Sequence, residues 1–198
     1  MDAAQQEFMR AGYASANTNN MALNGVSKAT IFRHYPTKRV LFEAVVARIA
    51  ARWSERVDAI SIIEPKPRDW LRAFGMRALR WILSDEALFV GRMAIADGPD
   101  HDTVRGIWMD NANEPVIAQL VERLCEWQTT GIFSSGDPRQ RAVMFFDLIL
   151  AGRVSRALYG IAEPRNSLAL QSHVDDCVDL FLYGCGTLVR ESTKKRRR

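Results

Sequence analysis

Four side chains that can bond to phosphate oxygens or to base edges occur within seven consecutive residues of this chain. They are Lys28, Thr30, Arg33 and His34. An arginine guanidinium can pair with guanine or phosphate through two parallel hydrogen bonds, whereas a lysine acts on phosphate as a point charge. This set of donors predicts contact with nucleic acid. The alternative for the charged members is a solvated helix face, which is the usual place of charged residues.

The residues that flank this set predict a short helix that presents it. Gly25 can adopt the left-handed conformation of a tight turn, and Ser27 can cap the following helix with its hydroxyl. Pro36 disfavours the helical conformation of Tyr35, so the helix ends after about two turns, a length that fits a DNA major groove. Its apolar residues fall on a separate face at helical spacing and are expected to point inward. They are Val26, Ile31 and Tyr35.

The net charge of the 198-residue chain is +4, and it is unevenly distributed. Residues 1–56 carry +4, residues 57–193 carry −5, and residues 194–198 carry +5. The basic character therefore lies around the short helix and in the tail, while the large middle is mildly acidic. We expect the tail, residues 191–198, to be a disordered, solvated extension with at most a minor, non-specific role in DNA binding.

The composition indicates a globular protein without a membrane segment. A hydrophobic content of 47% is enough for a buried core, and no apolar run approaches the eighteen or so residues of a membrane helix. Residues 1–6 do not resemble a signal peptide, so we expect a cytoplasmic protein with no membrane partner. Cys125, Cys177 and Cys185 form no CxxC pair and are expected to be buried thiols.

A long helix is predicted directly after the short one. Thr37 can cap it, and an apolar stripe at three- and four-residue intervals runs from Leu41 to Ile60. Pro65 and Pro67 end this helix because two prolines one residue apart cannot continue it.

The rest of the chain also has helical periodicity, with no strand pattern and no internal repeat. Helices are predicted over residues 69–83, 85–96, 102–124 or beyond, 139–159 and 167–188. Pro115 marks a kink or break in the third of these, and Asp137 and Pro138 take the cap and first-turn positions of the fourth. The predicted fold class is all-α, with an N-terminal three-helix helix-turn-helix head at 1–45 and a helical domain at 46–190.

The head resembles the TetR family of bacterial transcriptional regulators. That family has an aromatic residue, a Gly-Tyr pair, a threonine and then a stretch similar to GVSKxTLYxYFxxKxxLF. Here the matching residues are Phe8, Gly12, Tyr13, Thr18 and the segment GVSKATIFRHYPTKRVLF at 25–42. The later segment DPRQRAVMFFDLILAGRVSRALYG is similar to the family's C-terminal domain in pattern only.

The resemblance implies a regulator that is not an enzyme and that binds double-stranded DNA as a homodimer. Each subunit would offer one recognition helix to a half-site, so the two-fold symmetry predicts an inverted-repeat operator. A small-molecule effector bound to the second domain would change the separation of the heads, and the family most often represses. By position, the DNA-binding residues would be Thr18, Ser27, Lys28, Thr30, Phe32, Arg33, His34 and Lys38.

Two departures from the family pattern affect this set. The family's threonine usually stands nine residues before the turn glycine, whereas Thr18 stands seven before Gly25, which predicts a shortened second helix. Phe32 replaces the usual tyrosine and therefore lacks a hydroxyl that could bond to phosphate. The first helix also lacks the arginines that usually precede it.

Aromatic and sulfur side chains of the second domain are candidates for an effector site. They are Trp70, Phe74, Trp81, Phe89, Met93, Trp108, Trp127 and Phe145. The ordinary interior of a helical bundle explains any one of them as well. Four of the five tryptophans lie between Trp70 and Trp127, which favours an apolar or aromatic effector if a cavity exists.

Other classes of protein have weaker support in the sequence. No nucleotide-binding, hydrolase or metalloprotease motif is present, and no cofactor is predicted. The aspartates around His101 are explained as helix caps rather than as metal ligands. The remaining alternative is a helical binding or scaffolding protein that retains the head without DNA binding, and the shortened second helix is its best support.

Overall fold

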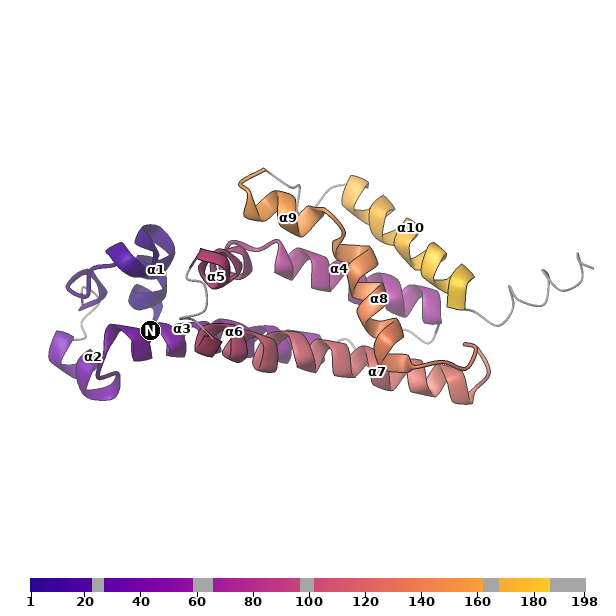
Figure 1. Cartoon of the computed structure of the whole chain (residues 1–198), viewed down its shortest axis with the longest axis horizontal. Coiled ribbons are helices and arrows are strands. Elements are labelled where there is room, and N and C mark those ends of the chain that lie inside the picture. The colour runs from indigo at the N-terminus through magenta and orange to yellow at the C-terminus, as the bar shows by residue number, and fades with distance from the viewer. Residues whose placement is uncertain (23–26, 59–65, 97–101, 162–167, 186–198) are drawn as a thin grey trace, which may run out of the picture. The chain divides into compact units, whose positions relative to one another are not determined.

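The computed structural model of the chain describes residues 1–22, 27–58, 66–96, 102–161 and 168–185. Every described element is helical, and no β-strand occurs in these ranges (Figure 1). The described residues form two compact units, each of which is treated by itself. Unit 1 comprises Met1–Ser54 and Asp85–Asn113, and unit 2 comprises Glu55–Ser84 and Glu114–Arg198.

Unit 1 contains the predicted head and two further helices. Its elements are α1 (Asp2–Ser15), the 3-10 turn η1 (Asn20–Ala22), α2 (Lys28–His34), α3 (Lys38–Asp58), α5 (Asp85–Ala96), α6 (Asp102–Trp108) and the π-helical segment η3 (Met109–Asn113). The shortened second helix of the head is present in the described residues only as the single turn η1. The preceding α1 is interrupted at Gly12, whose φ of 73° lies in the left-handed region.

Aromatic rings form the centre of unit 1. Phe8 of α1 and Phe42 of α3 are fully buried, and their ring centroids lie 5.0 Å apart in an edge-to-face arrangement. Tyr13 lies 5.0 Å from Phe42, and Phe89 of α5 lies 6.1 Å from it on another side. These contacts hold α1, α3 and α5 together, because each aromatic pair adds to the burial of apolar area.

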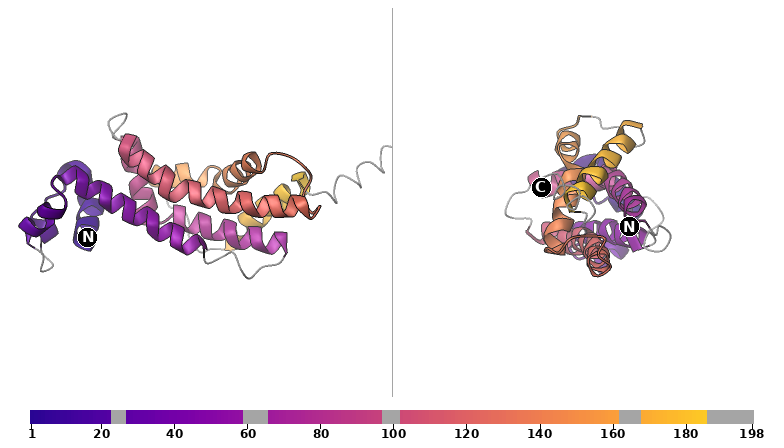
Figure 2. Two further views of the ribbon diagram at one scale, coloured as in Figure 1. Left: turned by 90° about the horizontal axis from the view of Figure 1, so that it is seen from below. Right: turned by 90° about the vertical axis from the view of Figure 1, so that its right-hand side faces the viewer.

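Unit 2 is a helical bundle in which α4, α8 and α10 pack against one another. Its elements are α4 (Pro67–Ile82), α7 (Glu114–Thr129), α8 (Pro138–Leu150), α9 (Arg153–Leu158) and α10 (Leu168–Cys185). The orange and yellow helices α8, α9 and α10 are neighbours in both views of Figure 2. Gly75 permits the close approach, since a Cβ atom there would lie 3.2 Å from Ile149 Cδ1 and 3.3 Å from Val174 Cγ1.

The interior of unit 2 is a continuous aromatic cluster. Trp70 stacks on Phe74 with centroids 4.7 Å apart and meets Trp127 edge to face at 5.6 Å. The cluster continues from Trp127 through three phenylalanines of the loop, α10 and α8. They are Phe133, Phe181 and Phe145. Burial of rings this large supplies much of the apolar stabilisation of the unit.

Several predicted helix boundaries are confirmed. The Asp137 carboxylate accepts a hydrogen bond from the Arg139 N–H at 2.9 Å, and Pro138 is the first residue of α8. The Thr37 hydroxyl accepts one from the Val40 N–H at 3.2 Å at the start of α3. The predicted stripe of α3 is buried as far as Trp53, and its Ile60 end lies outside the described residues.

The prediction of one unbroken helix over 139–159 is wrong. The helix ends at Leu150, and Gly152 takes φ 70° and ψ −28° before α9 begins at Arg153. Glycine has no Cβ atom that would clash in this left-handed conformation, so the break costs little free energy. Before Pro115, the predicted kink is a π-helical widening at Met109–Asn113, which accommodates a residue without an N–H.

The structure also bears on the predicted burial of the cysteines and on membrane-spanning helices. Cys177 is buried as predicted, but Cys125 is exposed on α7, so that part of the prediction is wrong. Among the described residues, none of the helices is both long and apolar enough to span a membrane.

Candidate nucleic-acid interface

The candidate interface is built on α2, whose start is fixed by Ser27. The Ser27 Oγ accepts a hydrogen bond from the Thr30 N–H at 3.1 Å and lies 2.9 Å from the Thr30 Oγ1. This is the predicted N-cap, and it satisfies one of the N–H groups that a helix start leaves open. The Thr30 hydroxyl is thereby held close to the helix end.

The other end of α2 is set by Pro36, as predicted. Tyr35 leaves the helical region, with φ −129° and ψ 87°, while its N–H still bonds to the Ile31 carbonyl at 2.9 Å. No residue of the fully described α2 is buried. The predicted inward residues Ile31 and Tyr35 are half-buried, and with Met21 and Leu41 they line a cavity of about 220 Å³ beside the start of α1. The apolar side of α2 is therefore only partly packed against the rest of unit 1.

The outward side of α2 carries the predicted donors. Lys28, Arg33 and His34 are exposed, whereas Thr30 and Phe32 are half-buried. Exposed cationic and polar groups on a capped helix match what phosphate and base-edge recognition requires.

Both predicted lysines also make contacts within the protein. Lys28 Nζ donates a hydrogen bond to the Asn19 Oδ1 at 3.0 Å and so ties α2 to the turn before η1. Lys38 Nζ donates to the Ala14 carbonyl at 2.9 Å and lies 5.3 Å from the centre of the Tyr13 ring. Since an ammonium group has three donors, Lys38 can bind the end of α1 and still offer hydrogen bonds to another acceptor.

The turn between α1 and α2 is organised by Asn17, a neighbour of the predicted Thr18. The Asn17 Oδ1 accepts a hydrogen bond from the Asn19 N–H at 2.9 Å, as asparagine side chains often do in turns. Thr18 is half-buried, and its side chain has no hydrogen-bond partner among the described residues. The side-chain bond to the backbone of this turn is therefore made by Asn17 rather than by Thr18.

A residue that the sequence analysis did not single out, Glu7, holds this turn in place. Its carboxylate is 6% exposed and accepts hydrogen bonds from the Asn17 N–H at 2.9 Å and the Asn20 Nδ2 at 3.2 Å. Arg10 binds both of its oxygens at 2.9 Å. The Asn17 N–H, followed by the Arg10 and Asn20 bonds, keeps the pKa of Glu7 below its usual range, despite the opposing effect of burial. A lone glutamate in a helical sequence carries no signal of such a role.

Glu7 is thus linked to the recognition helix through a short chain of polar contacts. Its carboxylate fixes Asn17 and Asn20, the turn carries Asn19, and Asn19 binds Lys28 of α2. These bonds contribute to the position of α2 relative to α1 within unit 1, since no residue of α2 is buried.

The predicted effector residues are divided between the two units. Trp70, Phe74, Trp81, Trp127 and Phe145 belong to unit 2, where all five are buried. The other three, Phe89, Met93 and Trp108, belong to unit 1. Among the described residues, no group of histidine, cysteine and acidic side chains is arranged to hold a metal ion.

Comparison with protein-family models identifies both parts of the chain. Residues 1–45 match the model of bacterial regulatory proteins of the tetR family. Residues 69–185 match the C-terminal domain of AefR-like transcriptional repressors. The comparison with curated protein sequences gives no match.

Several solved structures of regulators share this fold at low sequence identity. A TetR-family regulator of Mesorhizobium loti is 23% identical, with a TM-score of 0.85 and 94% of each chain covered. The flavonoid-responsive regulator FrrA is 20% identical, with a TM-score of 0.72 and 94% of each chain covered. The regulator FadR of Bacillus subtilis, solved with stearoyl-CoA, is 16% identical, with a TM-score of 0.72, covering 92% of this chain and 96% of its own.

The capped recognition helix, the all-α fold and the matched models define a ligand-responsive, DNA-binding transcriptional regulator rather than an enzyme. The chain belongs to the TetR family, and its C-terminal domain is of the AefR-like type. The family assignment confirms the resemblance found in the sequence, and it does not favour the scaffold alternative.

Proposed function

We propose that this regulator is a cytoplasmic repressor that binds an inverted-repeat operator as a homodimer and is released by a small hydrophobic effector. The proposal assigns residues 1–45 to DNA binding, 46–190 to regulation and dimerisation, and 191–198 to a basic tail outside the described residues. The observation that carries it is the exposure of Lys28, Arg33 and His34 on a helix capped by Ser27.

Within this proposal the residues of the head have separate roles. Arg33 reads a guanine, because an exposed guanidinium can bond to its O6 and N7 together. The remaining members contact phosphate or support those that do. They are Thr18, Ser27, Lys28, Thr30, Phe32, His34 and Lys38. Lys38 has two roles, because its ammonium group contacts phosphate and also holds the end of α1 through its bond to the Ala14 carbonyl.

Exposed apolar side chains on α8 and α10 support the homodimer. Leu180 and Tyr183 of α10 are 63% and 68% exposed, and Met144 of α8 is 57% exposed. Apolar groups gathered on two neighbouring helices favour burial against a second copy of the same face. Light scattering at micromolar concentration should report a dimer, and a monomer would contradict this part of the proposal.

The aromatic cluster of unit 2 is the proposed location of the effector. Its rings, among them Trp70, Phe74, Trp127 and Phe145, suit an apolar or aromatic compound. The buried indole Nε1 of Trp70 has no partner in the described structure and can donate to a polar atom of such a compound. FrrA is described as flavonoid-responsive, and FadR was solved with stearoyl-CoA, so an aromatic compound and a compound with an apolar acyl chain are both known for proteins of this fold.

Induction follows from linkage between the two sites. The effector binds more tightly to the conformation in which the two heads are too far apart or too close together for the operator. The ratio of its affinities for the two conformations limits how much it can weaken operator binding, and operator DNA weakens effector binding by the same factor. Quenching of tryptophan emission by a panel of hydrophobic compounds would support the effector class. A flat response across the panel would count against it.

Selection of bound fragments from a random DNA pool tests the proposal as a whole. The purified full-length chain should enrich an inverted repeat, with each half recognised by one subunit. The same selection with a Glu122→Gln variant, at an exposed position on α7 outside the head, serves as a control and should enrich the same repeat. Absence of any enriched sequence would favour a scaffolding protein that has kept the head alone.

A further inference from the structure

The break between α8 and α9 is stabilised by side chains of α10. A helix that ends leaves its last carbonyl groups without partners in the helix. Here the His173 Nε2 donates to the Ile149 carbonyl at 2.9 Å, and the Cys177 thiol donates to the Leu148 carbonyl at 3.4 Å. The end of α8 and the middle of α10 are therefore joined within unit 2.

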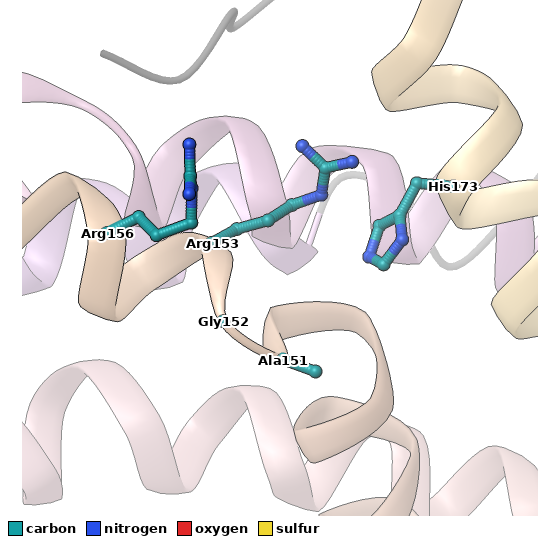
Figure 3. Close-up of a pocket in the computed structure, with 5 residues that line it drawn as sticks. All are labelled: Ala151, Gly152, Arg153, Arg156 and His173. Atoms are coloured by element: carbon teal, nitrogen blue, oxygen red, sulfur yellow. The ribbon is translucent and has the colours of Figure 1, made fainter. Parts of the chain in front are cut away.

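A surface hollow of about 380 Å³ lies at this break, and its described lining is rich in nitrogen donors. Ala151, Gly152, Arg153, Arg156 and His173 line it (Figure 3). The two small residues leave the space open, and the other three carry a guanidinium or an imidazole. None of these lining residues is acidic. The volume falls in the range of pockets that bind small molecules.

The two arginines are placed to act on one ligand. Arg153 and Arg156 are three residues apart on α9 and therefore lie on the same side of the helix. Figure 3 shows Arg153 extending from α9 toward His173 of α10, with Arg156 leaving the same helix one turn later. Each guanidinium has five N–H donors, so each can bind an anion and keep other contacts.

Two carboxylates of α10 follow His173 closely in the chain. Asp175 is bound to Arg72 of α4 at 2.6 Å, and Asp176 is exposed. Two fixed positive charges match the dianion of a phosphate monoester better than the single charge of a carboxylate.

We infer that the hollow at the α8–α9 break binds the phosphate group of a small anionic molecule through Arg153 and Arg156, with the His173 ring as its third wall. This deepens the proposed function, because it gives the effector, or a second ligand of the same domain, a phosphate group. The inference rests on the proposed function only for that regulatory role. Phosphate binding itself is a property of unit 2 and is measured without DNA.

Nuclear magnetic resonance of the histidine rings provides a local test. The chain has three histidines, so the ring signals are few, and a His173→Gln variant assigns the relevant one. Inorganic phosphate is titrated into the full-length protein at constant pH and ionic strength, with acetate as the carboxylate probe. The His173 signal should shift with saturation, and the R153Q/R156Q variant should bind phosphate at least about tenfold more weakly.

Two further variants make the test specific. R153K/R156K retains the charge but loses bidentate bonding, so its affinity should be intermediate. K66Q/R80Q removes two positive charges from exposed positions of unit 2 outside the hollow and should bind phosphate like the wild type. Circular dichroism verifies that each variant is folded.

Several outcomes would overturn the inference. They are an unmoved His173 signal, a shift of His34 alone, equal affinity for acetate and phosphate, and unchanged phosphate affinity in R153Q/R156Q. Since no DNA is present, any of these would leave the operator proposal intact. Conversely, failure to enrich an operator would leave a saturable phosphate site at His173 intact.

Discussion

The recognition helix of unit 1 and the aromatic interior of unit 2 are held in opposite ways. No residue of α2 is buried, and its position depends on the Ser27 cap and on the contacts that lead from Lys28 through Asn19 to Glu7. In unit 2, Trp70 and Phe145 are 1% and 0% exposed and lie within one cluster of rings. A surface that must meet DNA cannot be covered, so directed polar bonds replace burial there.

This contrast has a consequence for stability and for regulation. The free energy gained by burying apolar area is large and does not depend on bond direction. Unit 2 should therefore keep its stability when polar side chains on its surface shift slightly. Each polar bond of the head contributes much less, and its loss moves the recognition helix more than it unfolds the unit. We therefore expect substitutions in unit 2 to act mainly on the free energy of unfolding, and substitutions around α2 to act mainly on DNA binding.

The largest effect should come from the interior of unit 2. Phe145→Ala removes a fully buried ring between α8 and α10 and should lower the free energy of unfolding by about 3–5 kcal/mol. Chemical denaturation followed by tryptophan emission measures it. Ile132→Ala, at an exposed position of the same unit, should change the value by less than about 0.5 kcal/mol. Equal effects of the two variants would break the contrast.

A smaller effect, dependent on pH, is expected at Glu7. Its pKa is lowered in the folded protein, so the ionised carboxylate stabilises unit 1 above its usual pKa of 4.5. That contribution is lost as the pH falls through the lowered value. Glu7→Gln should remove this pH dependence and weaken DNA binding at neutral pH, because the turn that carries Asn17 and Asn20 loosens.

Thermal unfolding between pH 3 and pH 7 and a DNA titration at pH 7 measure the two effects of Glu7→Gln. Glu122→Gln, at an exposed position on α7, is the matched control and should change neither. A Glu7→Gln protein with the wild-type pH profile and wild-type DNA affinity would show that the polar bonds do not position α2.

The smallest change should follow loss of the helix cap. Ser27→Ala removes the acceptor of the Thr30 N–H and should cost α2 about 0.5–2 kcal/mol, while Ser27→Asn should retain most of this stability. Amide hydrogen exchange over residues 28–34 is the appropriate measurement, because it reports local opening. Unchanged exchange in Ser27→Ala would mean that something other than the cap holds the start of the helix.

The parts of this account that depend on local chemistry could be predicted from the sequence. Helix starts and ends follow from residue type, because a capping residue or a proline acts on the helix next to it in the chain. This holds for Ser27, Pro36, Thr37 and Asp137. The exposed face of α2 likewise follows from helical spacing. The all-α class required only the periodicity of the apolar residues.

The parts that depend on contacts distant in sequence could not be predicted. Glu7 gains its role from residues 10 and 13 positions later, and nothing in its own neighbourhood indicates that. Gly152 lies within an apolar pattern of helical period, and a glycine at such a place is compatible either with one continuous helix or with a break between two helices. The assignment of Phe89, Met93 and Trp108 to unit 1 depends on which helices pack together, and the sequence pattern does not indicate this.

The most direct test of the central claim is a titration of Arg33→Ala and Lys38→Ala against the selected operator and random DNA at several salt concentrations. Arg33→Ala should cost about 1–3 kcal/mol on the operator and relax sequence preference. Lys38→Ala should weaken both DNAs similarly and lower the salt slope by about one. If the two variants behave identically, or if Arg33→Ala keeps the full preference for the operator, α2 does not read the DNA sequence as this account requires.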